Sequence, residues 1–221
     1  MNNLTLVIPA KNEKDSLPIV LKEIKDYDCS VIVVLEETDE STIASIKDFN
    51  CKIIFQNGRG YGNAIIEGIN NVKTEYLCIF NADGSFDPKY LNKMLNLCGE
   101  NDFVFTSRYL PGGKSDDDTI VTKFGNYIFS SLGKIFFSLK ISDILFTYIL
   151  GKSKSFQSLN LKSQDFCLCV EIPIKAKRSN AKYIDIPSHE RLRIAGLKKV
   201  NEFRDGFKIL LGMIKLFLKI Y

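Results

Sequence analysis

The sequence predicts an α/β protein in which helices flank a mainly parallel β-sheet. Short apolar, β-branched runs alternate with segments of helical periodicity through residues 1–110, the pattern of strand–helix–strand units. Polar clusters follow directly after these runs, and in a parallel sheet such positions share one edge, where ligands bind. With 221 residues, 45% of them hydrophobic, the chain can bury a sizeable core in one domain.

The expected elements can be placed in chain order. Apolar runs predict strands at residues 4–8, 31–35, 52–55, 77–80 and 103–106. Helical spacing and cap residues predict helices at 17–24, 41–49, 64–72 and 88–98. Asp15 or Ser16 is the expected cap of the first helix, and Asp87 is the expected cap of the last, which Pro88 opens.

Composition narrows the class of protein. The net charge of +4 does not suggest a nucleic-acid binder, and no nucleic acid is expected as a partner. The six cysteines form no C-x-x-C pair and His189 is the only histidine, which argues against a zinc site and favours reduced thiols in a cytosolic protein. The N-terminus lacks the layout of a signal peptide, and no apolar stretch long enough to span a bilayer is free of charge, so no transmembrane helix is expected.

The end of the fourth strand is the first candidate site. The apolar run 77–80 stops at Asn81, Ala82 and Asp83. Two oxygen-bearing side chains separated by one small residue can turn toward a divalent cation carried by a nucleotide phosphate. An acidic strand-to-helix turn that binds nothing is the alternative for this segment taken alone.

A glycine-rich turn precedes the expected helix 64–72. Gly58, Gly60 and Gly62 alternate along it, and such glycines let a ligand approach the backbone while the helix N-terminus favours an anion. A simple connection is an equally good interpretation of this turn.

Polar residues after the other strands strengthen the case for a pocket. Lys11 and Glu13 follow the first strand, Glu36 the second and Arg108 the fifth. Their convergence on one sheet edge predicts a nucleotide-type pocket that is rimmed by carboxylates and closed by a cation.

Several motifs together resemble the family 2 glycosyltransferases, and within them the dolichyl- or polyprenyl-phosphate sugar transferases. In chain order they are Pro-Ala-Lys-Asn-Glu at 9–13, Gly-Tyr-Gly-Asn-Ala at 60–64, Asn-Ala-Asp at 81–83, Ser-Arg-Tyr-Leu-Pro-Gly-Gly at 107–113, Lys-Phe-Gly-Asn at 123–126, Ile-Ser-Asp at 141–143, Glu-Arg at 190–191, Gly-Leu-Lys-Lys at 196–199 and Arg-Asp-Gly at 204–206. The resemblance covers nearly the whole chain.

The resemblance implies a GT-A (Rossmann-like) fold and inverting sugar transfer from a UDP- or GDP-sugar. It assigns donor binding to Pro9, Lys11, Glu13, Glu36, Gly60, Gly62, Asn81 and Asp83. Asn81 and Asp83 stand where the family has an Asp-x-Asp pair that holds Mg²⁺ or Mn²⁺ against the diphosphate. An asparagine oxygen can also bind these ions, though more weakly than a carboxylate.

The chemistry of sugar transfer points to further residues. The departing diphosphate gains negative charge that a pocket must neutralise, and arginine's planar fork suits phosphate. Candidate acceptor and phosphate contacts are Arg108, Lys123, Arg191 and Arg193, and the candidate catalytic set is Asp83, Arg108, Asp143 and Arg191.

The acceptor decides whether a general base is needed. A polyprenyl phosphate is already a nucleophile, whereas a saccharide hydroxyl needs a carboxylate base. Asp143 and Glu171 are the candidates for that base; alternatively, Asp143 caps a helix and Glu171 is a buried charge paired with a basic residue. His189 is either an acid–base group or a neutral loop side chain.

The C-terminal end suggests contact with a membrane. Apolar residues recur at helical spacing from Phe207 to Tyr221, with Lys208, Lys215 and Lys219 along one line. A basic amphipathic helix of this kind suits an anionic membrane surface, although packing on its own domain or on a partner is the alternative. The apolar stretch 126–151 likewise suits either the core or a membrane interface.

These observations predict one catalytic domain over residues 1–205, followed by a basic amphipathic helix at 206–221. Residues 1–110 form the nucleotide-sugar-binding half and residues 111–205 the acceptor-side half. The expected function is transfer to a polyprenyl-phosphate or other lipid-linked acceptor in cell-envelope glycan biosynthesis, by a protein peripheral to the inner face of the membrane. The alternatives are transfer to a saccharide hydroxyl in surface-polysaccharide assembly and a catalytically impaired glycosyltransferase-like scaffold.

Overall fold

The computed structural model describes residues 3–196 and 199–220, so Leu197 and Lys198 of the predicted 196–199 motif, and Tyr221 at the end of the predicted C-terminal helix, lie outside the described residues. A seven-stranded sheet has the strand order β3-β2-β1-β4-β7-β5-β8. Its strands are β1 (Leu4–Pro9), β2 (Cys29–Leu35), β3 (Lys52–Phe55), β4 (Tyr76–Ile79), β5 (Phe103–Ser107), β7 (Ile149–Lys152) and β8 (Tyr183–Pro187). A separate pair is formed by β6 (Lys114–Ser115) and β9 (His189–Glu190).

The mainly parallel sheet is confirmed. All neighbours in the large sheet pair in parallel except β7, which runs antiparallel between β4 and β5. The five predicted strands are all present, whereas β7 and β8 were not predicted. Strand β7 is short and contains Gly151, which weakens any strand pattern. A Cβ at Gly151 would lie 2.5 Å from the carbonyl oxygen of Asp102, so the close approach of the neighbouring chain requires the glycine.

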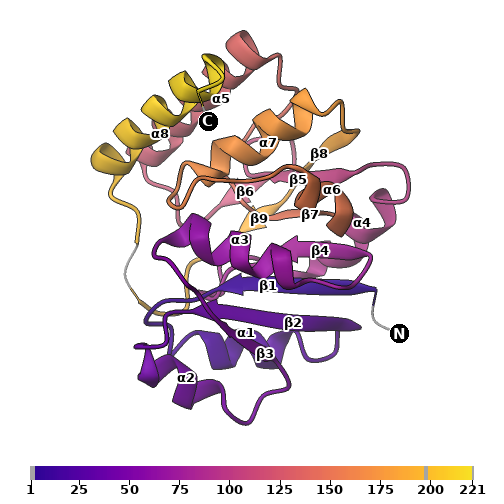
Figure 1. The fold of residues 1–221 in the computed structure, drawn as a ribbon, viewed down its shortest axis with the longest axis vertical. Helices are drawn as coiled ribbons and strands as arrows, with labels where there is room; N and C mark the ends of the chain where they lie inside the picture. Colours follow the sequence, from indigo (N-terminus) through magenta and orange to yellow (C-terminus); the bar gives the residue numbers. More distant parts are fainter. Residues whose placement is uncertain (1–2, 197–198, 221) are drawn as a thin grey trace.

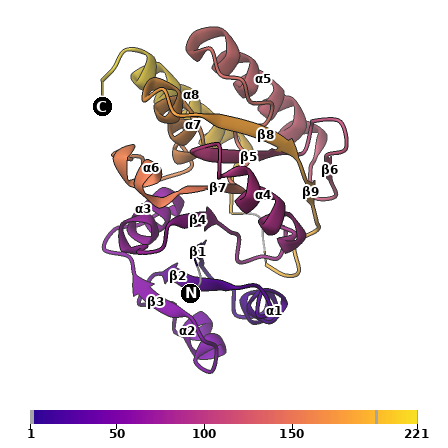
Figure 2. The ribbon, with the colours of Figure 1, turned by 90° about the vertical axis from the view of Figure 1, so that its right-hand side faces the viewer.

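Helices cover both faces of the sheet (Figures 1 and 2). The helices are α1 (Leu17–Glu23), α2 (Glu40–Ile46), α3 (Tyr61–Asn71), α4 (Leu91–Leu97), α5 (Ile120–Phe137), α6 (Ser153–Ser158), α7 (Leu168–Arg178) and α8 (Glu202–Phe217), with a 3₁₀ turn at Pro88–Tyr90 before α4. Figure 2 shows α3 and α6 on one side of the strands and α1 and α4 on the other. Alternate strand residues supply the two cores: Val7 belongs to the first, whereas Leu6 and Ile8 belong to the second.

The predicted caps are partly right. The side chain of Asp87 accepts a hydrogen bond from the backbone N–H of Lys89 at 3.0 Å and caps the 3₁₀ turn, as predicted. Ser16 occupies the cap position of α1, but its side chain makes no capping hydrogen bond there. Its hydroxyl instead donates to Glu13 Oε2 at 2.6 Å.

The C-terminal helix differs in extent from its prediction. It begins at Glu202, because the side chain of Asn201 caps it by accepting from the N–H of Arg204, and it ends at Phe217. Lys219 lies beyond the helix with a φ of +58°, so its predicted alignment with Lys208 and Lys215 is wrong. The helix buries Ile209, Met213 and Leu216 in the same core cluster as α3 and α7, and it lies beside α5 (Figure 1).

The stretch 126–151 divides into three parts. It supplies most of α5, a buried loop and strand β7. Leu139, Ile141 and Ile144 of the loop are buried, whereas Tyr127 and Ile135 of α5 are exposed. Within residues 3–196 and 199–220, no helix is both long and apolar enough to cross a bilayer.

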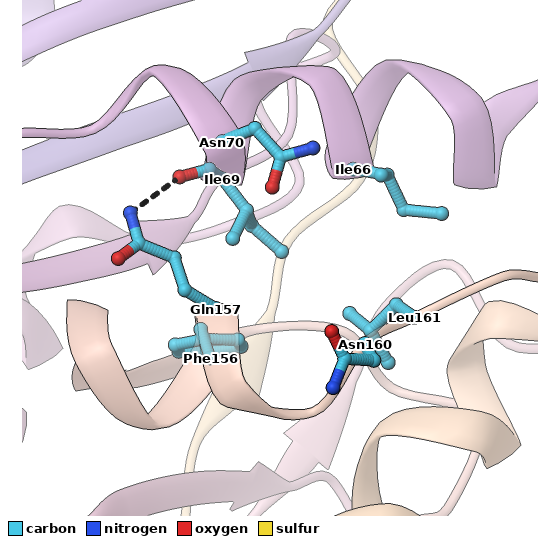
Figure 3. A pocket seen from close by; sticks show the side chains of 7 residues that line it. All are labelled: Ile66, Ile69, Asn70, Phe156, Gln157, Asn160 and Leu161. Atoms are coloured by element: carbon cyan, nitrogen blue, oxygen red, sulfur yellow. Dashed lines mark hydrogen bonds between the residues drawn. The ribbon is translucent and has the colours of Figure 1, made fainter.

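Two smaller features complete the fold. The six cysteines are free, and burial raises the pKa of the Cys98 and Cys169 thiols to about 12, which keeps them neutral. A cavity of about 140 Å³ lies between α3 and α6 (Figure 3). It is lined by Ile66, Ile69, Asn70, Phe156, Gln157, Asn160 and Leu161, with Gln157 Nε2 donating to the carbonyl of Ile69 at 3.2 Å.

Candidate active site

A cavity of about 770 Å³ lies at the carboxyl edge of the sheet, where β1, β2, β4 and β5 end. Of the site residues predicted from the sequence, it is lined by Pro9, Lys11, Glu13, Glu36, Gly60, Asn81, Asp83, Arg108 and Arg193. Gly62, Lys123, Asp143 and Arg191 are not among its lining residues. The structure therefore brings together nine side chains or backbone positions that are far apart in the sequence.

The first two strands supply a charged corner. Lys11 Nζ lies 2.8 Å from Glu36 Oε1. Glu13 is buried and its Oε1 accepts from Lys199 Nζ at 2.8 Å. Both carboxylates are thus held by lysines, and Gln56 at the end of β3 lines the same corner.

Gly60, the N-cap of α3, and Gly62, in its first turn, accommodate a loop of the chain itself. A Cβ at Gly60, whose φ is +105°, would lie 2.4 Å from the carbonyl oxygen of Gln164, and one at Gly62 would lie 2.2 Å from that of Ser163. The N–H of Asn63, in the first turn of α3, donates to the carbonyl of Gln164 at 3.0 Å. This close packing explains why both positions are glycine; donor binding at Gly60 and Gly62 stays a prediction.

Glu171 anchors the loop that packs on these glycines. Its side chain is fully buried, accepts from the backbone N–H groups of Lys162 and Ser163, and lies 2.7 Å from Lys175 Nζ. The structural alternative for Glu171, a buried charge paired with a basic residue, is confirmed. Glu171 does not line the large cavity.

Asn81 and Asp83 line the cavity just beyond the end of β4. Asp83 Oδ1 accepts from the N–H and hydroxyl of Ser85 at 3.0 and 2.7 Å, and Asp83 Oδ2 lies 4.0 Å from Arg193 Nη1. Asn81 Nδ2 donates to Ser85 Oγ at 3.3 Å, which turns the amide oxygen away from this hydroxyl.

This donor set fits a metal that also binds a diphosphate. Mg²⁺ commonly takes one or two protein oxygens and completes its shell with phosphate oxygens and water. Across the described residues, no group of three or more His, Cys, Asp or Glu side chains is arranged to hold a metal. Asn81 and Asp83 therefore suit a shared metal–diphosphate site rather than an all-protein cage.

Arg108 is locked by three carboxylates on the far side of the cavity. Its Nε and Nη2 donate to the two oxygens of Asp143 at 2.7 and 2.9 Å, and its Nη1 donates to Asp118 at 3.3 Å and to Glu190 at 3.0 Å. Burial alone would lower the pKa of the guanidinium, but Asp143 and Glu190 outweigh it and raise that pKa well above its ordinary value. Four of the five guanidinium donors are engaged, and the fifth, one N–H on Nη2, has no partner among residues 3–196 and 199–220, so it is available to a ligand.

Asp143 binds Arg108 and does not line the cavity. Its side chain is fully buried, and Oδ2 also accepts from the backbone N–H of Arg108 at 3.1 Å. No helix starts at Asp143, so the helix-cap alternative is wrong. Because both oxygens accept N–H groups, the carboxylate orients Arg108.

The other predicted basic residues have different positions. Arg191 forms a two-pronged pair with Glu23 at 2.6 and 2.9 Å and donates to the carbonyls of Gly84 and Phe86, which ties the segment after β9 to α1. Arg193 pairs with Asp117 and lines the cavity. His189 lies in β9 and its Nε2 is 2.5 Å from Asp116 Oδ2.

The sequence predictions missed several lining residues. Asp117, Asp118 and Glu190 form an acidic wall around Arg108 and Arg193; the acidic run 116–118 was the visible signal for two of them. Burial raises the pKa of Glu190, and the charge and hydrogen bonds of Arg108 and Ser115 oppose that rise.

Apolar side chains form another part of the cavity wall. Helices α5 and α8 contribute Val121, Phe124, Phe129, Phe203 and Ile209 to the lining. Val121, Phe124 and Phe203 are also exposed to solvent, so they form the mouth of the cavity. Only the tertiary structure shows this mouth, because it pairs two helices that are distant in sequence.

Comparison with known proteins agrees with this geometry. The family model described as glycosyl transferase family 2 matches residues 5–159. An undecaprenyl-phosphate mannosyltransferase of Micrococcus luteus is 25% identical over 195 residues, covering 82% of this chain and 80% of that relative. A low-salt glycan biosynthesis hexosyltransferase of Haloferax volcanii is 22% identical over 218 residues, covering 93% of this chain and 51% of that protein.

Solved structures show the same fold. Glucosyl-3-phosphoglycerate synthase from Mycobacterium tuberculosis, solved with Mn²⁺ and UDP-glucose, has a TM-score of 0.73 at 12% identity and covers 97% of this chain and 78% of its own. Mannosyl-3-phosphoglycerate synthase from Rubrobacter xylanophilus has a TM-score of 0.68 at 14% identity, covering 96% and 71%. These likenesses establish the GT-A fold, and the family match establishes the class. The chain belongs to glycosyl transferase family 2 and is a glycosyltransferase.

Proposed function

We propose that this glycosyltransferase moves a sugar, with inversion, from a UDP- or GDP-sugar to a polyprenyl phosphate or another lipid-linked acceptor. The observation that carries the proposal is one cavity with a polar floor at the strand ends and an exposed apolar mouth between α5 and α8. A nucleotide-sugar matches the floor, and an amphiphilic acceptor matches the mouth.

The donor would lie along the ends of β1, β2 and β4. Lys11, Glu13 and Glu36, which line the cavity there, would contact the base and ribose, and Asn81 and Asp83 would hold Mg²⁺ or Mn²⁺ with the diphosphate. When bound, the metal supplies Lewis-acid stabilisation of the charge that develops on the leaving group. Arg193, 4.0 Å from Asp83, adds a cation beside the same phosphates.

The acceptor side favours a phosphate nucleophile. Asp143 accepts hydrogen bonds from Arg108, and the buried Glu171 accepts from the backbone of its own loop. Both bases considered from the sequence therefore already have hydrogen-bond partners. A polyprenyl phosphate needs cations to position it more than a base to activate it. The remaining N–H of Arg108 is suited to that task. The undecaprenyl-phosphate acceptor named for the Micrococcus luteus relative supports this choice.

A saccharide hydroxyl is the second candidate acceptor, favoured by Glu190. This buried carboxyl lines the cavity, and Arg108 and Ser115 both donate to its Oε2. Burial nevertheless raises its pKa, so it is a better proton acceptor than an ordinary glutamate. Loss of transfer in Glu190→Gln with a saccharide acceptor, and no transfer to polyprenyl phosphate, would favour this function.

The test compares donors first and acceptors second. Thermal shift with UDP- and GDP-sugars, with and without Mn²⁺, should identify a donor that stabilises the chain only together with the metal. Product formation is then measured with a short polyprenyl phosphate, 3-phosphoglycerate and a saccharide. Transfer to the polyprenyl phosphate alone supports the proposal; donor binding without transfer to any acceptor supports the impaired scaffold.

The α5–α8 surface is the proposed membrane contact. Its exposed apolar side chains include Ile120, Phe124, Tyr127, Ile135, Phe203, Phe207, Leu211 and Ile214, and Lys208 and Lys215 lie on α8. Apolar side chains among lysines suit the headgroup region of an anionic bilayer. This surface surrounds the cavity mouth, so a lipid acceptor could enter without leaving the membrane.

We expect the double substitution Phe207→Ser and Ile214→Ser to weaken binding to anionic vesicles at least about tenfold. The two side chains are 63% and 47% exposed and line no part of the cavity, so the fold and transfer to a soluble short-chain acceptor should be retained. Vesicle co-sedimentation measures the effect.

The control is Phe55→Ser. Phe55 is 45% exposed and is the last residue of β3. Strand β3 lies far from α5 and α8, toward the opposite end of the molecule (Figure 1). Equal losses in both variants would indicate non-specific adsorption, and unchanged binding in the double variant would contradict the proposed surface.

A further inference from the structure

The cavity wall contains a buried polar group without a partner. Asn126 on α5 lines the cavity and is only 1% exposed. Its Nδ2 forms no hydrogen bond within the described part of the protein. Leaving a buried donor unsatisfied is costly. The unsatisfied amide therefore indicates that a ligand in the cavity supplies an oxygen to accept its hydrogen bond.

The orientation of the amide is fixed by the backbone. The N–H of Leu145 donates to Asn126 Oδ1 at 3.2 Å. If the amide were flipped, two donors would face each other, so the oxygen must point to Leu145 and the NH₂ group is the one left over.

Asn126 lies on the proposed acceptor side of the cavity. The segment that holds it, residues 144–147, also contains Phe146, whose ring lies 4.6 Å from the Arg108 guanidinium. Lys11, Glu36 and Gln56, the donor corner, follow β1, β2 and β3 at the other end of the sheet. Along α5, Val121 and Phe124 are exposed and lie at the mouth of the cavity, whereas Asn126, which comes after them in the helix, is buried.

We infer that Asn126 Nδ2 binds an oxygen of the acceptor's phosphate, at the boundary between the apolar mouth and the charged floor. An apolar chain lying between α5 and α8 would bring its polar head to this depth, between Asn126 and the free N–H of Arg108. This assignment rests on the proposed lipid-phosphate acceptor and adds Asn126 as a residue that binds the phosphate group of that acceptor.

Asn126→Asp is the sharpest test. Aspartate keeps an oxygen for the N–H of Leu145 but replaces the NH₂ donor with a negative charge. We expect the KM for a short polyprenyl phosphate to rise about 10- to 100-fold, with donor affinity, measured with the nucleotide-sugar and Mn²⁺, unchanged. If Asn126→Asp does not fold, as judged by thermal unfolding, Asn126→Ser removes the amide without adding charge and should give about a tenfold rise in the same KM.

Ser130→Ala is the matched control. Ser130 lies one turn further along α5, is buried, and its hydroxyl accepts from the N–H of Ile144 at 3.1 Å, so it holds the same segment without lining the cavity. A merely structural role for Asn126 predicts equal effects at both positions, whereas the inference predicts an acceptor KM change only at Asn126.

The outcomes separate this inference from the proposed function. Wild-type transfer to polyprenyl phosphate with an unchanged acceptor KM in the Asn126 variant overturns the inference and leaves the function standing. A change confined to donor affinity also overturns it and assigns the amide to the donor sugar. Absence of transfer to polyprenyl phosphate by the wild type, with donor binding intact, overturns the proposed function itself.

Discussion

Asp83→Asn is expected to lower the transfer rate by about 10³-fold or more, while the protein stays folded. The substitution neutralises the carboxylate of Asp83, which follows β4 and is the charged partner of Asn81 in the proposed metal site, and so removes several kcal/mol of metal-assisted stabilisation of the leaving diphosphate. The asparagine retains an oxygen to accept from the N–H and hydroxyl of Ser85, so the turn should persist. Initial rates at saturating donor and Mn²⁺, with thermal unfolding as the fold check, measure the effect.

Asn81→Asp provides the opposite change at the neighbouring position. It adds a second carboxylate to the same site, so we expect half-maximal activity at a lower Mn²⁺ concentration than in the wild type. Near-normal turnover in Asp83→Asn, or an unchanged Mn²⁺ requirement in Asn81→Asp, would show that these two residues do not hold the metal.

Arg108→Met is expected to destabilise the fold by about 3–5 kcal/mol and to reduce transfer by at least about 10²-fold. The arginine is only 10% exposed at its side chain and is the shared partner of Asp143, Asp118 and Glu190. Its removal leaves the fully buried carboxylate of Asp143 without its guanidinium partner. An uncompensated buried charge lowers the free energy of unfolding more than replacement of both partners does. Chemical denaturation measures the stability, and rates at low temperature measure the transfer.

The double variant Arg108→Met, Asp143→Asn separates the two effects. Removing the unpaired charge should recover part of the lost stability, whereas transfer should stay low because the proposed phosphate contact of Arg108 is still missing. Recovery of transfer along with stability would mean that Arg108 acts only in holding the fold. Arg108→Lys should also fail to restore transfer, since lysine lacks the two-pronged geometry that Asp143 meets.

Much of the polar floor of the cavity could be predicted from the sequence. Lys11, Glu36 and Asp83 each follow an apolar run, and in a parallel sheet the ends of such runs must share an edge. The convergence of these residues on one cavity confirms that reasoning. The same logic missed β7, because a four-residue strand that is buried on both faces between β4 and β5 leaves no alternating pattern of its own.

The proposed acceptor side was harder to predict because its residues depend on contacts made across the fold. The mouth between α5 and α8 required the two helices to pack together, and the sequence showed only that each was apolar. The placement of Asn126 depends on the N–H of Leu145, which belongs to an irregular loop with no periodic signal.

The sequence by itself determined the class of fold, the family and the set of strand-end residues available for chemistry. Those properties follow from local periodicity and short motifs, which operate over a few neighbouring residues. Only the tertiary structure decided which charges neutralise each other. Arg108 binds Asp143, 35 positions away, and Arg191 binds Glu23, 168 positions away. A charged side chain can pair with any opposite charge that folding brings within reach, so its partner, and therefore its role, is set by packing.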